Sequence, residues 1–114
     1  MTVSDYQNLD IWQRSVDFVV SIYALTKTFP SSEKYGLTSQ IQRAAVSIPS
    51  NIAEGYRKHS KEDFRRFLYI SLGSAAELET QLIIVNRVYL LETKKLLEEI
   101  IVIQKMLNAL IKKL

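Results

Sequence analysis

The side chains that could carry acid–base or metal chemistry are three glutamates and one histidine. Glu54 on one predicted helix and Glu77 or Glu79 on the next could form a carboxylate pair, an arrangement used for metal binding and for proton transfer. A di-metal helix bundle also needs Glu-x-x-His pairs on two helices, but the only histidine, His59, has Tyr56 three residues before it. We therefore expect structural or hydrogen-bonding acids, with no metal and no cofactor.

Other catalytic signatures are also missing from the sequence. It contains no Cys and no Gly-x-Ser-x-Gly nucleophile elbow, and its histidine has no obvious orienting acid. Gly36, Gly55 and Gly73 are isolated, so no glycine-rich phosphate loop is present. The sequence predicts that the chain is not an enzyme and takes no small-molecule substrate.

Positive charge is concentrated in the segment that follows Tyr56. Five cations stand close to His59 and are offset by Glu62 and Asp63; they are Arg57, Lys58, Lys61, Arg65 and Arg66. The free N–H groups at a helix N-terminus would add to their attraction for phosphate, and Tyr56 and Phe64 could stack on bases. This segment is the candidate nucleic-acid-binding site. The alternative is an ordinary solvated charged turn.

The segment from Ser47 to Gly55 combines small residues with a proline, an amide and an acid. A second set of small residues surrounds Gly73, namely Ser71, Ser74, Ala75 and Ala76. We expect the two small surfaces to meet, with Asn51 and Glu54 satisfying backbone groups that Pro49 leaves free. The structural positions of the motif are Pro49, Asn51, Glu54, Gly55, Gly73, Glu77 and Glu79.

The chain has only three Gly and two Pro, and its apolar residues recur at spacings of three and four, which predicts an all-α protein. Four helices are expected, over about 9–28, 33–56, 61–86 and 93–113. Short connections make an antiparallel up-and-down four-helix bundle that forms one domain over residues 1–114. Asn8 or Asp10 should cap the first helix, Ser60 should cap the third with Asp63, and Pro49 should kink or break the second.

The helices carry more apolar surface than one bundle needs. Second stripes stand beside the main ones in the first and third helices, at Leu9, Trp12, Val16, Val19 and Tyr23, and at Tyr69, Leu72, Ala76 and Ile83. Exposed apolar patches usually mark interfaces, so we expect a homo-oligomer. The alternative is that these residues are flanking core positions.

Composition and charge suit a soluble protein of the cytoplasm. The net charge is +3 and the pI about 9.2, a mildly basic balance that favours anionic partners. Cysteine is absent, Met1 to Asp10 is polar and acidic without a signal-like apolar run, and no segment suggests a membrane span. We expect no membrane partner.

Five segments of the sequence resemble one family. They are 9–13 (LDIWQ), 29–30 (FP), 35–41 (YGLTSQI), 43–55 (RAAVSIPSNIAEG) and 72–80 (LGSAAELET). The chain is similar to the bacterial four-helix-bundle proteins related to those encoded in 23S ribosomal RNA intervening sequences. The resemblance implies a cytoplasmic homopentameric ring without catalytic residues. It also implies kinship with accessory proteins of diversity-generating retroelements, which partner a reverse transcriptase and bind nucleic acid.

Two functional hypotheses follow. In the first, an oligomeric scaffold associates with RNA or a ribonucleoprotein, and the five cations after Tyr56 contact phosphates. In the second, the oligomer is an interaction module that docks a partner protein such as a reverse transcriptase, and the basic turn is incidental.

Overall fold

The structure is a computed structural model that describes residues 5–114, so the first four residues of the predicted polar N-terminus lie outside it. Its elements are two short 3-10 helices, η1 (Asp5–Asn8) and η2 (Ser31–Glu33), and the helices α1 (Asp10–Thr26), α2 (Leu37–Arg57), α3 (Lys61–Tyr89) and α4 (Lys94–Lys113). The described residues form four α-helices and no strand, which confirms the all-α prediction.

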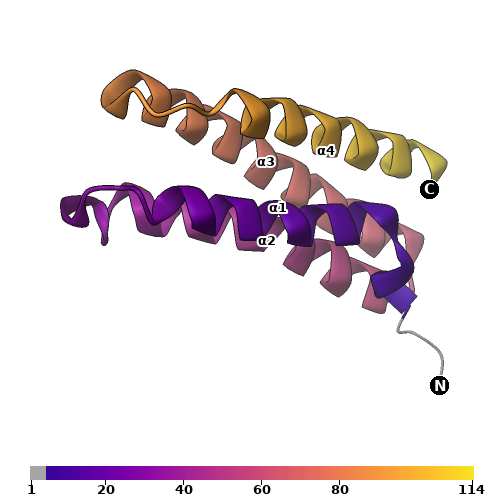
Figure 1. Cartoon of the computed structure of the whole chain (residues 1–114). Helices are drawn as coiled ribbons and strands as arrows, with labels where there is room; N and C mark the ends of the chain where they lie inside the picture. The colour runs from indigo at the N-terminus through magenta and orange to yellow at the C-terminus, as the bar shows by residue number, and fades with distance from the viewer. Residues whose placement is uncertain (1–4) are drawn as a thin grey trace.

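Each α-helix packs against the next one in the chain, and α4 also contacts α1. The chain turns back after every helix, so the α2–α3 turn lies at the same end of the molecule as η1 and the C-terminus (Figure 1). Side-chain pairs give the register of α2 and α3, because Ser47 pairs with Ser74 while Gly55 lies against Phe67.

One apolar core runs between the four helices. Its fully buried members are mostly Ile and Leu, among them Ile22, Ile41, Ile48, Ile52, Leu68, Leu78, Leu82, Ile100, Ile103 and Leu107. Removal of these side chains from water is the main force that holds the helices together. They belong to the stripes with spacings of three and four that the sequence shows.

The start of α2 differs from the prediction by four residues. Ser31–Glu33 forms the separate helix η2, and α2 begins only at Leu37. The backbone N–H of Leu37 donates to the Glu33 carboxylate at 3.2 Å, so the acid occupies a free donor at the helix N-terminus. The carboxylate therefore helps to fix where α2 begins.

One predicted helix cap is confirmed and another is wrong. Ser60 caps α3, because its hydroxyl accepts a hydrogen bond from the Asp63 N–H at 3.3 Å. At α1 the N-cap is Leu9, without a side-chain hydrogen bond, so neither Asn8 nor Asp10 has the predicted role. The turn formed by η1 places Leu9 at the cap.

Pro49 lies buried inside α2, and the helix continues through it, so the predicted break does not occur. The predicted kink stays a prediction. Asn51 donates to the carbonyl and hydroxyl oxygens of Ser47 at 2.8 and 2.9 Å. Packing against α3 and these side-chain bonds support the helix where the proline removes one backbone hydrogen bond.

Among residues 5–114, α3 is the one helix long and apolar enough to cross a membrane by length and composition. The sequence expectation therefore understated its apolar character. The core helix of a soluble protein passes the same test, and α3 packs against both α2 and α4. Less than half of its apolar window is buried, however, so much of this surface faces outward.

Candidate nucleic-acid interface

The basic segment forms a tight turn between α2 and α3. Lys58 continues the last turn of α2, and its N–H donates to the Gly55 carbonyl at 3.2 Å. His59 then adopts a left-handed backbone with φ of 58°, and Ser60 is extended before α3 begins at Lys61. A turn this short keeps the cations at the end of α2 close to those in the first turns of α3.

Aromatic rings lie beneath three of the cations. The Arg57 guanidinium stands 5.2 Å from the centre of the Tyr6 ring, which η1 contributes. The Phe67 ring has Arg66 at 4.5 Å and Lys58 at 5.8 Å from its centre. These cation–π contacts orient charges that would otherwise move freely in solvent.

A shallow hollow opens beside the turn. Tyr56 and Phe64 form one wall, with their rings in an edge-to-face contact at 5.6 Å between centres. His59, Ser60 and Lys61 complete the lining. The hollow thus combines aromatic surface, a cation and the N-terminus of α3, which are the features that suit a phosphate beside a base.

The predicted cations differ in their surroundings. Arg57, Lys58, Lys61 and Arg66 are exposed, whereas Arg65 is half-buried. Arg66 also pairs with Asp63 at 3.3 Å, and both side chains of this ion pair face solvent. The structure therefore gathers all five predicted residues at one turn, and Asp63 neutralises part of their charge.

Sequence reasoning missed Tyr6 and Phe67 as members of this site. Phe67 follows Arg66 directly in the sequence and is buried in the structure. Tyr6 is distant in sequence from the turn, so its contact with Arg57 depends on the packing of η1 against α2. The position of Phe67 next to Arg66 could have suggested that these two residues contact each other. No local feature of the sequence points to the contact between Tyr6 and Arg57.

The two small surfaces meet in part. The Ser47 and Ser74 hydroxyls are hydrogen-bonded at 2.9 Å, and the buried Ser71 hydroxyl donates to the Ile48 carbonyl at 2.9 Å. A Cβ atom at Gly55 would lie 2.6 Å from the Cβ of Phe67, so only glycine fits there. The segment from Ser47 to Gly55 is therefore a close-packing surface toward α3.

Gly73 does not belong to that contact, so its predicted packing role is wrong. It is exposed, and a Cβ atom built on it would meet nothing within 4 Å. Ala76 is exposed as well. Both residues lie on the outer side of α3, because the helix turns Ser71, Ser74 and Ala75 toward α2 and the core instead.

Glu54 does not form a carboxylate pair with Glu77 or Glu79. Since Ser47 lies opposite Ser74, Glu77 is placed beside the first half of α2, roughly 14 Å along the helix from Glu54. Glu77 accepts a hydrogen bond from Gln81 at 3.1 Å, and Glu79 accepts one from Gln104 at 2.8 Å. Within residues 5–114, no group of three or more His, Cys, Asp or Glu is placed to bind a metal.

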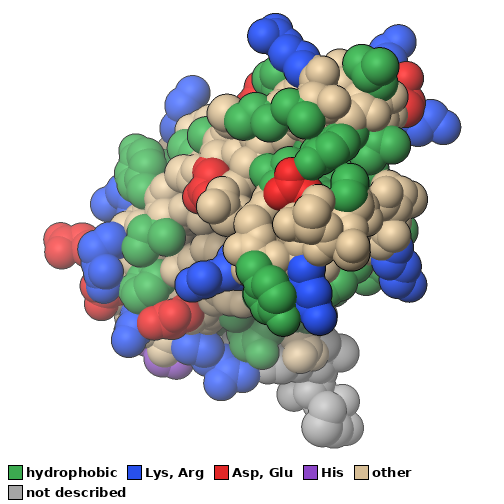
Figure 2. Space-filling model, turned by 90° about the vertical axis from the view of Figure 1, so that its left-hand side faces the viewer, with side chains coloured by type: hydrophobic (Ala, Val, Ile, Leu, Met, Phe, Trp, Pro, Cys, Tyr) green, Lys and Arg blue, Asp and Glu red, His purple; other side chains and the backbone are tan. Residues whose placement is uncertain are grey.

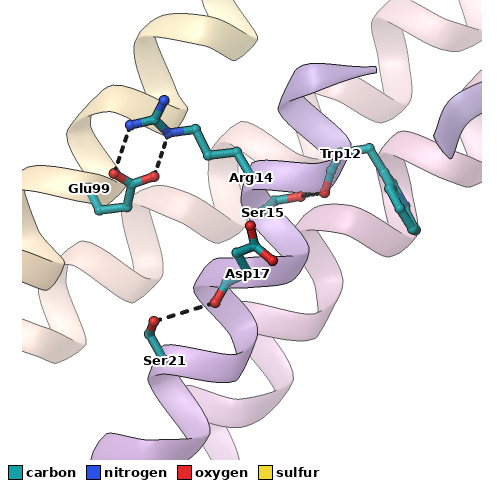
Figure 3. A network of polar contacts seen from close by, with 6 residues as sticks. All are labelled: Trp12, Arg14, Ser15, Asp17, Ser21 and Glu99. Carbon is teal, nitrogen blue, oxygen red and sulfur yellow. Dashed lines mark hydrogen bonds and ion pairs between the residues drawn. The ribbon is translucent and has the colours of Figure 1, made fainter. Parts of the chain in front are cut away.

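An open hollow lies between α1 and α4, and its lining includes Phe18, Leu96 and Met106. Arg14 reaches across it to Glu99 with two hydrogen bonds of 2.6 and 3.0 Å, and both side chains are partly exposed (Figure 3). The hydrogen bond and the negative charge of Glu99 raise the pKa of Arg14. This ion pair links two helices that share few other contacts.

Another polar contact lies at the end of the bundle that carries the α1–α2 and α3–α4 connections. The Tyr89 hydroxyl at the end of α3 donates to the same Glu33 carboxylate that accepts from Leu37. These two hydrogen bonds lower the pKa of Glu33, and the bond to Glu33 raises the pKa of Tyr89. Phe29 stacks on the Tyr89 ring at 6.4 Å, so the α1–α2 connection is held against the end of α3.

Comparisons with known proteins agree with this fold. A crystal structure of a protein with unknown function from the S23 ribosomal protein family of Bacteroides thetaiotaomicron superimposes with a TM-score of 0.82 at 28% sequence identity, covering 90% of this chain and 98% of that one. No curated protein matches significantly. The family model described as 23S rRNA-intervening sequence protein matches residues 7–109, nearly the whole chain. The chain belongs to the 23S rRNA-intervening sequence protein family.

Proposed function

We propose that this chain is a non-catalytic, oligomeric bundle protein of the cytoplasm that associates with RNA or a ribonucleoprotein through its α2–α3 turn. In this proposal its helices form an antiparallel up-and-down bundle and its copies form a ring, which the family resemblance suggests has five members. The family is described as 23S rRNA-intervening sequence protein, and this link to ribosomal RNA supports RNA as the partner.

The observation that carries the proposal is the clustering of five cations on one turn. Arg57, Lys58 and Arg66 are oriented by aromatic rings, while Lys61 lines the hollow beside Tyr56 and Phe64. One such turn gives weak binding because the chain carries a net charge of only +3. Repetition of the turn in an oligomer strengthens binding through avidity.

The test is a titration of structured RNA at low and at moderate salt. Phosphate contacts release counterions, so binding should weaken steeply as salt rises. Reversal of two charges, in the variant Arg65→Glu with Arg66→Glu, should weaken binding at low salt by at least about tenfold and leave the helical circular-dichroism spectrum unchanged. The absence of binding at low salt would reject the proposal.

A matched control is the reversal of Lys94 and Lys95, which lie exposed at the start of α4, at the end of the bundle opposite the α2–α3 turn (Figure 1). It changes the net charge by the same amount away from the turn. If the control weakened binding as much as the reversal of Arg65 and Arg66, general charge would explain the binding and the turn would not be the site.

The second candidate is an accessory scaffold that docks a partner protein such as a reverse transcriptase. Exposed hydrophobic side chains on α3 favour it, because such surfaces serve protein interfaces. In that case, a partner captured from the host should remain bound at high salt, where RNA bound to the basic turn is released.

A further inference from the structure

Hydrophobic exposure is concentrated on one helix. Of the eleven large hydrophobic side chains that are exposed among the described residues, six lie on α3 or directly after it, at 37% to 84% exposure; they are Tyr69, Ile70, Ile83, Ile84, Val88 and Leu90. Figure 2 shows hydrophobic side chains open to solvent at the end of the bundle that carries the α1–α2 and α3–α4 connections. A single chain in solution leaves this surface uncovered.

Five exposed residues form a stripe along α3, with small residues in the middle and larger ones at the two ends. Tyr69, Gly73, Ala76, Thr80 and Ile83 follow one another at alternating spacings of four and three, and all are exposed. We call these five residues the α3 stripe. The stripe has room at its centre, since nothing lies within 4 Å of a Cβ atom placed on Gly73. Small residues of this kind let another element approach a helix closely.

A second apolar surface lies on the other pair of helices. Val20 on α1 is 66% exposed, Tyr23 is 41% exposed and Val46 on α2 is 40% exposed. We call these three residues the α1–α2 patch. Tyr23 and Val46 line the same shallow hollow, so α1 and α2 present them together. No Cα atom of α1 lies within 8 Å of α3. Val20 and Tyr23 stay exposed, so they do not cover the α3 stripe of their own chain.

We propose that the α1–α2 patch of one copy packs on the α3 stripe of another copy. The inference rests on the self-association in the proposed function and assigns the surfaces that carry it. The patch offers exposed Val and Tyr side chains, and the stripe offers open space at Gly73 for side chains of another copy. Head-to-tail contact covers both surfaces, whereas twofold pairing of two stripes would leave every α1–α2 patch exposed.

Chemical crosslinking can test this contact directly, because the chain has no cysteine. Gly73→Cys and Val20→Cys each add one thiol at an exposed position. The two variants are unfolded, mixed, refolded and treated with a short bis-maleimide. A crosslinked pair is expected from the mixture and from neither variant alone. The matched control replaces Gly73→Cys with Ala109→Cys, exposed on α4, and should give no pair.

A pair formed by Gly73→Cys alone would show twofold contact between stripes and would overturn the proposal. The absence of a pair in the mixture would overturn it as well. RNA titration of the same protein separates this inference from the proposed function. Wild-type assemblies that bind RNA without the crosslink contradict only the assigned surfaces, and crosslinked assemblies that bind no RNA contradict only the function.

A charge placed on the stripe provides an independent readout. Ala76→Arg should reduce the mass measured by analytical ultracentrifugation toward that of one chain, while Ala109→Arg keeps the wild-type mass. Both variants should keep the wild-type circular-dichroism spectrum, since both sites are exposed. An unchanged mass for Ala76→Arg would contradict the proposal. So would a wild-type protein that stays a single chain and floats with phosphatidylcholine vesicles, because the stripe would then be a lipid-binding surface.

Discussion

At Gly55 the absence of a side chain sets how closely α2 and α3 approach. Any Cβ atom there would overlap the Cβ of Phe67, and Phe67 in turn orients two cations of the basic turn. At Gly73, on the outer side of α3, the space is open. Two glycines that look alike in the sequence therefore have different roles, and only the packing of the helices distinguishes them.

Gly55→Ala should destabilise the protein by about 1–3 kcal/mol, because the added methyl group must push α3 away from α2. Gly73→Ala is the matched control. It should stabilise the helix by up to about 1 kcal/mol, since alanine favours helix and meets no neighbour within its own chain. Urea unfolding of both variants measures the difference. A Gly55→Ala protein as stable as wild type would contradict the close contact.

Tyr89→Phe should lower the Tm at about pH 7, and this loss should shrink toward about pH 3. The folded-state pKa of Glu33 is lowered, mainly by the hydrogen bond from Tyr89. The ionised acid therefore contributes its full stabilisation above its unfolded pKa, and this stabilisation is lost as pH falls through the folded pKa. Thermal unfolding across this range tests the sign.

Tyr35→Phe is the control for that experiment, because Tyr35 is 89% exposed. It removes the same hydroxyl group from a side chain in solvent, and its Tm should follow wild type at every pH. If Tyr89→Phe lowered the Tm by the same amount at low and at neutral pH, this result would contradict the link to Glu33 ionisation.

At the scale of the elements, helix periodicity was a reliable guide and helix ends were less so. Ile41, Ile48 and Ile52 are buried along one face of α2, as their spacing predicts. The start of α2 was missed because it depends on the separate helix η2 and on the hydrogen bond that the Leu37 N–H donates to Glu33, which the local sequence does not reveal. Continuity through Pro49 was missed because it depends on packing against α3, which local propensity does not contain.

Ser71→Ala should lower the free energy of unfolding by about 1 kcal/mol, because the buried hydroxyl links α3 to the Ile48 carbonyl of α2. The control Ser50→Ala removes a hydroxyl from an exposed position on α2 and should change stability much less. Chemical denaturation of both proteins checks this. Equal effects would mean that the bond between the two helices adds nothing.

At the scale of the whole molecule, the sequence identified the basic segment but not its geometry. The five cations lie close together in the sequence, so their clustering could be predicted without knowledge of the fold. Tyr6 joins them only because η1 packs against α2, and the exposure of Gly73 and Ala76 only becomes evident once α3 is oriented by its core face. Of the predicted second stripes, Tyr23, Tyr69 and Ile83 are exposed. Leu9, Trp12, Val19 and Leu72 instead pack against the core as flanking positions.

In the proposed function, copies of this bundle assemble and present their basic turns to RNA. The most direct test is the mass of the protein in solution, measured by analytical ultracentrifugation with and without structured RNA at low salt. We predict a mass of several chains without RNA, a larger complex with RNA, and loss of the RNA but not of the assembly as salt rises. A mass of one chain under every condition would contradict the proposed assembly.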